Sequence, residues 1–400
     1  MSDSSCHPRH FSVHSPACCS IIPPHIFQEI AQNGDAEQRQ RAHEMLEQSS
    51  EIRGERKAFS LLGEALAVPT GQKRRTIYDA QSKRDLPGKL VRSEGDKAVK
   101  DAAVNEAYDG SGDTYDFYSK FFGRNSIDGK GLRIDSSVHY GEKYANAQWN
   151  GRQMLYGDGD GQLFNRFTLA LDIIAHELTH GVTQYSAALI YRDQSGALNE
   201  HFSDVFGILV KQYKLKLSAS RSDWLIGKGL FTKDVRGVAV RSMKAPGTAY
   251  DDKVVGKDPQ PAHMKNFVTT TADNGGVHVN SGIPNHVFYR VATILGGNAW
   301  EVAGKIWYDT LTRKLKSDAD FQACADATYQ SAGDLFGIGN SPQHAVIEGW
   351  KAVGIEISKQ VLISGPRIPV MPKSAPPVLL PDAAAEIPID RAKGKRSVKR

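Results

Sequence analysis

The chain has 400 residues, of which 40% are hydrophobic, and its formal net charge at pH 7 is +5. This length and hydrophobic content can build two sizeable cores with a cleft between them, which favours an enzyme. Much of the positive charge comes from the last ten residues, without aromatic interleaving, and no apolar run is long enough to span a bilayer. We therefore expect neither nucleic acid nor a membrane as a partner.

Residues 1–70 differ in composition from the rest and are predicted to be a propeptide, with a flexible leader as the alternative. Pro23-Pro24 predicts a stiff extended segment, and a helical, charged stretch is expected from residue 28 to about residue 48. A stiff segment loses little entropy on ordering, so it is suited to occupy a cleft. The first residues lack the apolar region of a signal peptide, which predicts secretion by another route or a precursor in the cytoplasm.

The following parts predict an α+β protein with two lobes. Residues 71–165 contain short strand patterns and one helix at 103–122, which predicts an N-terminal β-rich lobe. Residues 166–357 contain long amphipathic stretches, which predict a C-terminal helical lobe. Residues 358–400 are rich in proline and end in basic residues, so we expect a disordered tail. Helices within the second lobe are expected at residues 285–295, 299–315 and 319–332.

The most informative stretch is His176-Glu177-Leu178-Thr179-His180, which follows an apolar run at residues 169–175. On a helix, positions i and i+4 share a face, so both imidazoles can bind one zinc ion while Glu177 acts as a base on water. The surrounding residues are too apolar for a solvated face, and a buried histidine pair is costly without a metal. The motif therefore predicts a zinc site on a buried helix.

A second helical segment supplies the remaining groups of this site. Glu200 is the expected third ligand, which leaves the fourth position of a catalytic zinc open. Asp204 lies one helical turn later and is placed to accept the outer N–H of a ligating imidazole. Tyr191 and His278 are candidate donors to the charge that develops on a tetrahedral intermediate. Asp273 would keep His278 oriented or charged.

Four motifs occur in the order and approximate spacing of one known family. They are His176-Glu-Leu-Thr-His180, Gly196-Ala-Leu-Asn-Glu200 through Asp204, Arg241-Ser-Met243 and Asp273-Asn-Gly-Gly-Val-His278. Over about residues 86–354 the chain resembles the thermolysin-like zinc metallopeptidases, which are gluzincins. The resemblance implies a two-lobed fold in which the zinc helix lies at the cleft between a mainly β-sheet lobe and a mainly α-helical lobe.

The resemblance implies the same zinc ligands, base and oxyanion donors, and it adds a substrate site. Arg241 would hydrogen-bond the substrate carbonyl just beyond the scissile bond. Asn146 and Ala147 would hold the peptide as an added strand. The pocket for the residue after the cleaved bond would be lined by Phe164, Phe167, Ile173, Ile226 and Val240. The implied activity is that of a neutral endopeptidase that cleaves on the N-terminal side of bulky hydrophobic residues.

The sequence departs from the family at its double calcium site. Asp172 and Asp223 remain there, whereas other expected ligand positions hold Lys211, Leu225, Lys228 and Gly229. Calcium needs six or more oxygen ligands and is repelled by ammonium groups, so we expect no calcium at this place. The turn Asp158-Gly159-Asp160-Gly161 lacks the closing glutamate of an EF-hand loop and is predicted to join two strands instead.

Residues 1–70 also resemble the short propeptide of the protealysin-like subgroup. This implies a self-processed precursor in which the propeptide inhibits its own enzyme, with Cys19 or His25 as groups that approach the zinc. We expect a monomer that acts on proteins and peptides. Two other classes remain open: a zinc aminopeptidase, for which no amine-anchoring site is evident, and a catalytically silent zinc protein that acts as a binding partner.

Overall fold

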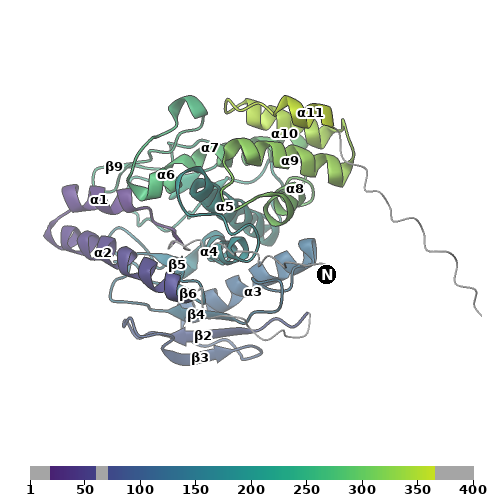
Figure 1. The fold of residues 1–400 in the computed structure, drawn as a ribbon. Helices are drawn as coiled ribbons and strands as arrows, with labels where there is room; N and C mark the ends of the chain where they lie inside the picture. The colour runs from purple at the N-terminus through teal and green to yellow at the C-terminus, as the bar shows by residue number, and fades with distance from the viewer. Residues whose placement is uncertain (1–18, 60–70, 365–400) are drawn as a thin grey trace, which may run out of the picture. The chain divides into compact units, whose positions relative to one another are not determined.

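A six-stranded sheet and a group of helices form the two lobes of this α+β protein, as predicted (Figure 1). The structure is a computed structural model and describes residues 19–59 and 71–364. The strands of the sheet are β1 (Cys19–Ser20), β2 (Arg75–Asp79), β3 (Lys89–Ser93), β4 (Ile134–Val138), β5 (Ala147–Trp149) and β6 (Met154–Tyr156). Their order is β1-β5-β6-β4-β2-β3, so β1 covers the edge that β5 would otherwise expose.

The centre of the molecule is a pair of helices, α4 (Leu171–Gln184) and α5 (Asp193–Leu215). Helix α4 packs against β5 on one side and α5 on the other, and it is buried from Asp172 to Thr183. The two helices approach closely at Gly207, where a Cβ atom would lie 2.6 Å from the carbonyl oxygen of Asp172. This glycine therefore lets the histidine-bearing face of α4 meet the carboxylate-bearing face of α5.

The other elements surround this pair. Two small antiparallel sheets pair β7 (Leu225–Ile226) with β8 (Arg241–Ser242) and β9 (Asp251–Asp252) with β10 (Gly256–Lys257). The remaining helices of the second lobe are α6 (Asp273–Asn280), α7 (Gly282–Leu295), α8 (Ala303–Asp309), α9 (Phe321–Phe336), α10 (Ser341–Lys351) and α11 (Lys359–Ser364). Short helical turns are η1 (Phe167–Leu169), η2 (Met264–Asn266) and the π-helical η3 (Thr310–Lys314).

Most predicted helices are present. The helix expected at residues 103–122 is α3 (Ala102–Phe122), which begins where the Asp101 side chain accepts hydrogen bonds from two backbone N–H groups and ends at the left-handed Gly123. Those expected at residues 285–295 and 319–332 correspond to α7 and α9. The stretch expected to be helical at 299–315 is helical over most of its length, but α8 begins only at Ala303 and is followed by the π-helical turn η3.

The helical, charged stretch expected from residue 28 to about residue 48 is present, but it belongs to two helices. The structure has α1 (Pro24–Asn33) and α2 (Ala36–Phe59), separated at Gly34 and Asp35. Gly34 ends α1, and Asp35 and Gln38 then exchange side-chain-to-backbone hydrogen bonds of 2.9 Å in each direction. This reciprocal capping starts a new helix. Pro24 is the first residue of α1, so only Pro23 of the proline pair is extended.

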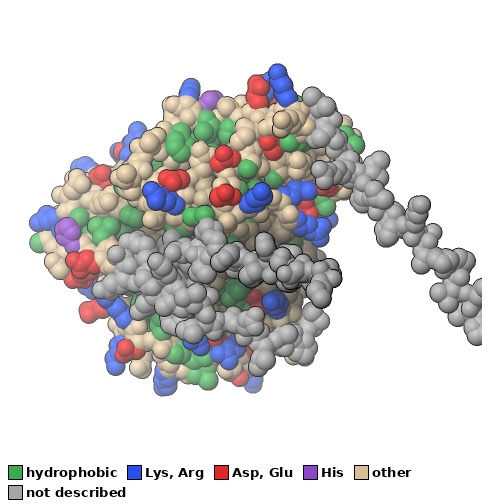
Figure 2. Space-filling model, viewed as in Figure 1, with side chains coloured by type: hydrophobic (Ala, Val, Ile, Leu, Met, Phe, Trp, Pro, Cys, Tyr) green, Lys and Arg blue, Asp and Glu red, His purple; other side chains and the backbone are tan. Residues whose placement is uncertain are grey.

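Most of the predicted tail, and both ends of the predicted leader at residues 1–70, lie outside the described residues. Helix α11 occupies the first part of the predicted tail, and residues 365–400, 1–18 and 60–70 are not described. The boundaries at 70, 165 and 357 stay predictions. Within the described part, no helix is long and apolar enough to cross a membrane. On the face shown in Figure 2, basic and acidic side chains are interspersed.

The turn at residues 158–161 is tied to both β4 and α3 by one histidine. The turn leaves β6 and leads to Phe164, an isolated bridge residue, rather than to a second full strand as expected. His139 follows β4 with a left-handed φ of 53°, and its ring nitrogens lie 2.8 Å from carboxylate oxygens of Asp158 and Asp101. Because a carboxylate only accepts hydrogen bonds, both ring nitrogens must donate, which requires an imidazolium.

The first pH prediction concerns this histidine. The hydrogen bond to Asp158, together with that to Asp101, outweighs burial and raises the pKa of His139 to about 9. A raised folded-state pKa stabilises the protein below the unfolded value of about 6.5, and this stabilisation disappears as the pH rises through about 9. We expect the melting temperature of the wild type to fall more steeply between pH 7 and 10 than that of His139→Gln. His43→Gln, at an exposed position of α2, should behave like the wild type; equal slopes for His139→Gln and the wild type would refute the assignment.

Candidate metal centre and active site

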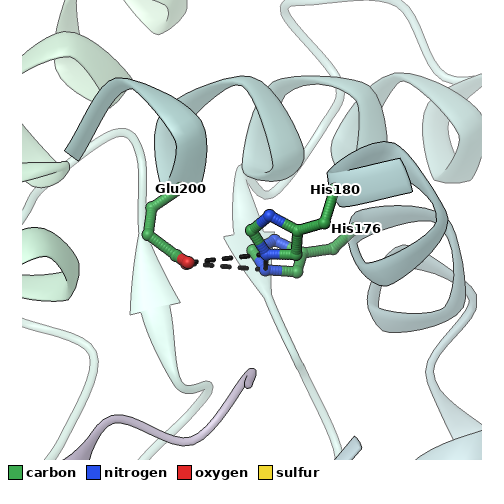
Figure 3. Close-up of side chains that lie close together, drawn as sticks. All are labelled: His176, His180 and Glu200. Carbon is green, nitrogen blue, oxygen red and sulfur yellow. Dashed lines mark hydrogen bonds and ion pairs between the residues drawn. The ribbon is translucent and has the colours of Figure 1, made fainter. Parts of the chain in front are cut away.

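Three predicted metal ligands come together in the buried contact between α4 and α5. His176 and His180 project from one face of α4, and Glu200 of α5 faces them (Figure 3). Among the described residues, these three form the one group of histidine, cysteine or acidic side chains with the spacing of a metal site. All three are at most 1% exposed.

The geometry and chemistry of this group fit zinc. The two Nε2 atoms lie 3.0 Å apart, and the Glu200 oxygens lie 3.4 Å from His180 Nε2 and 3.5 Å from His176 Nε2. Tetrahedral zinc with bonds of about 2.0–2.1 Å separates its ligand atoms by about 3.3 Å. The Oε2 atom of Glu200 is buried and receives no hydrogen bond from any of the described residues. Two imidazole nitrogens and a carboxylate are a ligand set typical of catalytic zinc.

Each histidine is oriented by a hydrogen bond at its other ring nitrogen. His176 Nδ1 donates to Asp204 Oδ1 at 2.8 Å, the contact that the sequence predicts. His180 Nδ1 lies 2.8 Å from Asn199 Oδ1, a partner that sequence reasoning missed. Asn199 directly precedes Glu200 on α5, and its proximity to His180 depends on how α4 and α5 pack. With both Nδ1 atoms donating, both Nε2 lone pairs are available to a metal.

Asp204 is a buried carboxylate compensated by a buried guanidinium. Arg241 of β8 donates from Nε and Nη2 to the two oxygens of Asp204 at 2.8 and 2.7 Å. Burial would raise the pKa of Asp204, but Arg241 and the hydrogen bond from His176 outweigh it and hold the pKa far below its usual range. Asp204 is therefore charged, and it accepts the hydrogen bond from His176 as a carboxylate anion.

The side chain of Glu177, on α4, reaches strand β5. Its Oε2 accepts a hydrogen bond of 2.9 Å from the backbone N–H of Trp149 in β5. The carboxylate of Glu177 is thus held beside the strand that the resemblance assigns to substrate binding. This backbone donor carries no signal in the sequence, because every residue type except proline offers it at position 149.

The predicted oxyanion donors also come together. Tyr191 OH donates to Glu200 Oε1 and lies 3.2 Å from His278 Nε2. Asp273 accepts from both Nδ1 and the backbone N–H of His278, at 2.7 and 2.9 Å. Residues 274–276 all have left-handed φ values, and this turn brings the Asp273 carboxylate back onto His278. Burial would lower the pKa of His278, but Asp273 and Glu200 raise it to about 9.

A segment of the chain itself lies in this site. Strand β1 pairs antiparallel with β5, with Cys19 opposite Trp149. The pairing continues beyond the strand, where Ile21 N–H donates to the Ala147 carbonyl at 3.2 Å. Ile22 N–H donates to Asn146 Oδ1 at 3.0 Å. Asn146 and Ala147 thus hold the N-terminal segment as an added strand.

The carbonyls of this segment meet two further predicted residues. His278 Nε2 lies 3.0 Å from the carbonyl oxygen of Ser20. Arg241 Nη1 donates to the next carbonyl oxygen, that of Ile21, at 3.0 Å. The peptide bond between Ser20 and Ile21 therefore lies between the His278 and Arg241 donors.

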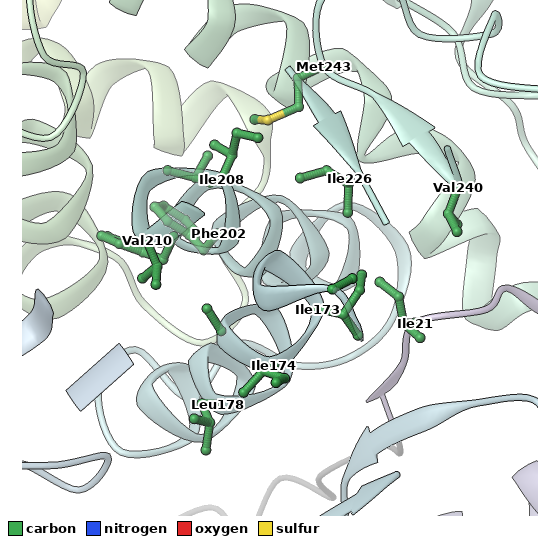
Figure 4. Packing of buried hydrophobic residues seen from close by; sticks show 14 of the residues in the cluster. Ile21, Ile173, Ile174, Leu178, Phe202, Ile208, Val210, Ile226, Val240 and Met243 are labelled. Atoms are coloured by element: carbon green, nitrogen blue, oxygen red, sulfur yellow. The ribbon is translucent and has the colours of Figure 1, made fainter. Parts of the chain in front are cut away.

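The predicted pocket residues divide into two groups. Ile21 is fully buried and points toward Ile173, with Ile226 and Val240 in the same cluster (Figure 4). Phe164 instead contacts Phe27 of α1, with the two rings tilted and their centroids 6.3 Å apart. Phe167 lies behind Phe164, with its centroid 6.2 Å from that ring. In this structure Phe164 therefore contacts α1, whereas Ile173 lies beside Ile21.

His25 does not belong to the metal group. Its Nε2 lies 2.8 Å from the hydroxyl of Tyr250, and burial lowers the pKa of His25 to about 4, so the ring is neutral. The expectation that His25 approaches the zinc is therefore wrong. The side chain of Cys19 lies outside the described residues, so its part of that expectation stays untested.

Family comparisons match consecutive parts of the chain. Residues 19–55 match the protealysin propeptide, residues 55–184 the catalytic domain of thermolysin metallopeptidases, and residues 187–355 their alpha-helical domain. The chain belongs to the thermolysin family of metallopeptidases. The resemblance read from the four motifs and from the N-terminal segment is confirmed, and so is the presence of a propeptide.

Two relatives of this metallopeptidase and one solved structure match over most of their own length. The extracellular metalloprotease of Pectobacterium carotovorum subsp. carotovorum is 51% identical over 345 residues, which cover 86% of this chain and 98% of that protein. Protease PrtS of Photorhabdus sp. (strain Az29) is 46% identical over 346 residues, which cover 85% and 93%. The solved precursor of protealysin, a metalloproteinase from Serratia proteamaculans, has a TM-score of 0.77 and 50% identity, covering 84% of this chain and 99% of that one.

Proposed function

We propose that this metallopeptidase is a zinc endopeptidase whose ligands are His176, His180 and Glu200. The observation that carries the proposal is the convergence of two oriented Nε2 atoms and a buried carboxylate beside Glu177. Zinc, when bound there, would polarise the scissile carbonyl and lower the pKa of a water molecule.

The chain's own groups would do the rest of the chemistry. Glu177, anchored by the Trp149 N–H, would take a proton from the attacking water and pass it to the leaving nitrogen. His278, oriented by Asp273, would donate to the carbonyl oxygen as it becomes negative, together with Tyr191. These donors are buried, where their interaction with a developing charge is stronger than in water.

The test of this proposal is hydrolysis of casein by the mature enzyme. We expect a chelator to abolish it and zinc to restore it, with internal peptides as products. Glu177→Gln, cleaved to the mature form by added wild-type enzyme that is then removed, should lower kcat/KM by at least about 10²-fold, because a general base is lost, with unchanged zinc content. Glu348→Gln, at an exposed position of α10, is the matched control. Release of single amino acids would indicate an aminopeptidase, and no hydrolysis at all a silent zinc protein.

We also propose that the enzyme cleaves before bulky hydrophobic residues. Support comes from Ile21, which is fully buried beside Ile173 while the carbonyl before it faces His278. Arg241 and Asn146 would hold a substrate backbone as they hold the backbone of residues 21 and 22. An apolar pocket of this kind excludes charged side chains, because they would lose their hydration without a partner.

A peptide series that varies only the residue after the cleaved bond tests this preference. Burying a Leu or Phe side chain contributes about 1.5–3 kcal/mol. Peptides with Leu or Phe at this position should therefore have a kcat/KM at least about tenfold higher than peptides with Asp or Lys. Equal rates for Asp, Lys and Leu would refute the pocket assignment and leave the zinc chemistry intact.

We propose further that residues 19–59 are an inhibitory propeptide that occupies the substrate site. It is held by the β1–β5 pairing, by Arg241 on Ile21 and by the contact of Phe27 with Phe164. Self-processing would remove it. We propose that the enzyme acts outside the cell, as the name of the Pectobacterium relative supports. We also propose that it is a monomer.

Ile21→Asp in the full-length precursor tests the inhibition. A carboxylate cannot be buried beside Ile173 without a partner, so the segment should leave the site. We expect unprocessed Ile21→Asp precursor to hydrolyse a short fluorogenic peptide at least tenfold faster than unprocessed wild type, with processing followed on gels. Ile21→Leu keeps an apolar side chain and should stay inhibited; equal activity of all three precursors would contradict this role.

We propose, finally, that a lysine replaces calcium beside the zinc helices. Lys211 Nζ donates to Asp172 Oδ2 at 3.1 Å and to the Leu225 carbonyl at 2.8 Å, and it lies 3.4 Å from Asp223. Burial would lower the pKa of Lys211, but Asp172 and Asp223 raise it, so the ammonium is charged. This ammonium occupies the space between the carboxylates that a calcium ion would need.

A further inference from the structure

The contacts of Asp204 continue away from the metal centre, into the core of the helical lobe. Its Oδ2 accepts a hydrogen bond of 2.8 Å from Asn285 Nδ2, on α7. Asn285 Oδ1 in turn lies 2.8 Å from His201 Nδ1, on α5. His201 Nε2 accepts a hydrogen bond of 2.7 Å from the indole Nε1 of Trp307, on α8. His201, Asn285 and Trp307 are each at most 1% exposed.

The direction of every hydrogen bond between Trp307 and Asp204 follows from the indole N–H of Trp307. An indole N–H can only donate, so His201 Nε2 must accept from Trp307. The neutral ring then carries its proton on Nδ1 and donates to Asn285 Oδ1. This orients the Asn285 amide with Nδ2 toward Asp204. The carboxylate of Asp204 can only accept, so both ends of the series require the same direction.

This direction matters at the zinc ligand. Asp204 receives four donors: Asn285 Nδ2, two nitrogens of Arg241 and His176 Nδ1. Asn285 and Arg241 fix the position and charge of the carboxylate, and that carboxylate in turn selects the tautomer of His176 with its proton on Nδ1. The Nε2 lone pair of His176 is then directed at the metal position.

We propose that Asn285, His201 and Trp307 are positioning residues for the metal centre, acting on His176 through Asp204. The proposal rests on the proposed function in that His176 is taken to be a zinc ligand. It extends the site by three residues of α5, α7 and α8, and within the described part of the chain none of their side chains hydrogen-bonds to a proposed zinc ligand or to residues 20–22. Removing a donor from Trp307, His201 or Asn285 would leave the buried acceptor that it serves without a hydrogen bond. The Asp204 carboxylate would then be held less firmly in place.

The first test is zinc affinity, measured by competition with a chromogenic chelator on the full-length chain carrying Glu177→Gln, so that no self-cleavage intervenes. Removing a partner of a metal ligand typically costs 10–100-fold in metal affinity. Asn285→Leu removes the donor to Asp204 at similar volume, and we expect zinc affinity to fall about tenfold. Unchanged affinity in a folded Asn285→Leu protein would overturn the proposal.

The second test separates positioning from packing. Trp307→Phe removes the indole donor at the start of the series, whereas Trp350→Phe removes one of the same kind elsewhere in the helical lobe. Trp350 is equally buried, and its Nε1 donates to Thr328 Oγ1 at 2.9 Å, away from the metal centre. Both variants lose similar volume, so both should lose stability in urea. Only Trp307→Phe should weaken zinc binding, by a few-fold; equal zinc affinities for the two variants would overturn the proposal.

Different results would refute the proposed zinc endopeptidase function and the positioning role of Asn285, His201 and Trp307. If the full-length chain binds no zinc, the proposed function fails. If it binds zinc and cleaves casein, but the Asn285 and Trp307 variants bind zinc as the wild type does, only the positioning network fails.

Discussion

The fold and the site depend on one buried charge, that of Asp204. A lone carboxylate in a protein interior is strongly unfavourable, and here it is compensated by a bidentate guanidinium and two further donors. The donors come from α4, β8 and α7, while Asp204 belongs to α5. The same four hydrogen bonds therefore join four elements and orient His176, which we propose as a metal ligand. Any displacement of one element would leave a charge or a polar group unpaired at the centre of the molecule.

Arg241 links this buried charge to the peptide-binding surface. Its Nε and Nη2 are engaged by Asp204, and its Nη1 donates to the carbonyl oxygen of Ile21. A planar guanidinium fixed on one edge presents its remaining donors in a defined direction. The arrangement that supports His176 thus also sets where a peptide carbonyl lies. Metal ligation and peptide orientation share one structural support.

The N-terminal segment uses the sheet in the way that an extended peptide does. Strand β5 would be the edge of the sheet without β1, and an edge strand offers unpaired backbone groups. The chain covers this edge with its own residues and buries Ile21 in the process. Backbone pairing is independent of side-chain type, so the same edge can receive other peptides once this segment has left.

Local patterns in the sequence determined the chemistry of the site. The spacing of His176, Glu177 and His180 on one helix, and of Glu200 and Asp204 on the next, sets which side chains share a face, because helical periodicity is a local property. The same locality explains why α3, α7 and α9 were predicted well. The break at Gly34 and Asp35 was also encoded locally, as a capping pattern that the helix prediction overlooked.

Only the tertiary structure decided the contacts between distant segments. Asn199 reaches His180 because α4 and α5 pack closely at Gly207, and Asn285, His201 and Trp307 meet Asp204 through contacts between three helices. The partners of Asn285 are more than 80 positions away along the chain, so no sequence periodicity relates them. The division of the pocket residues between Ile21 and Phe27 likewise depends on where α1 lies. The sequence determined which groups can perform the chemistry, and packing decided which groups hold them in place.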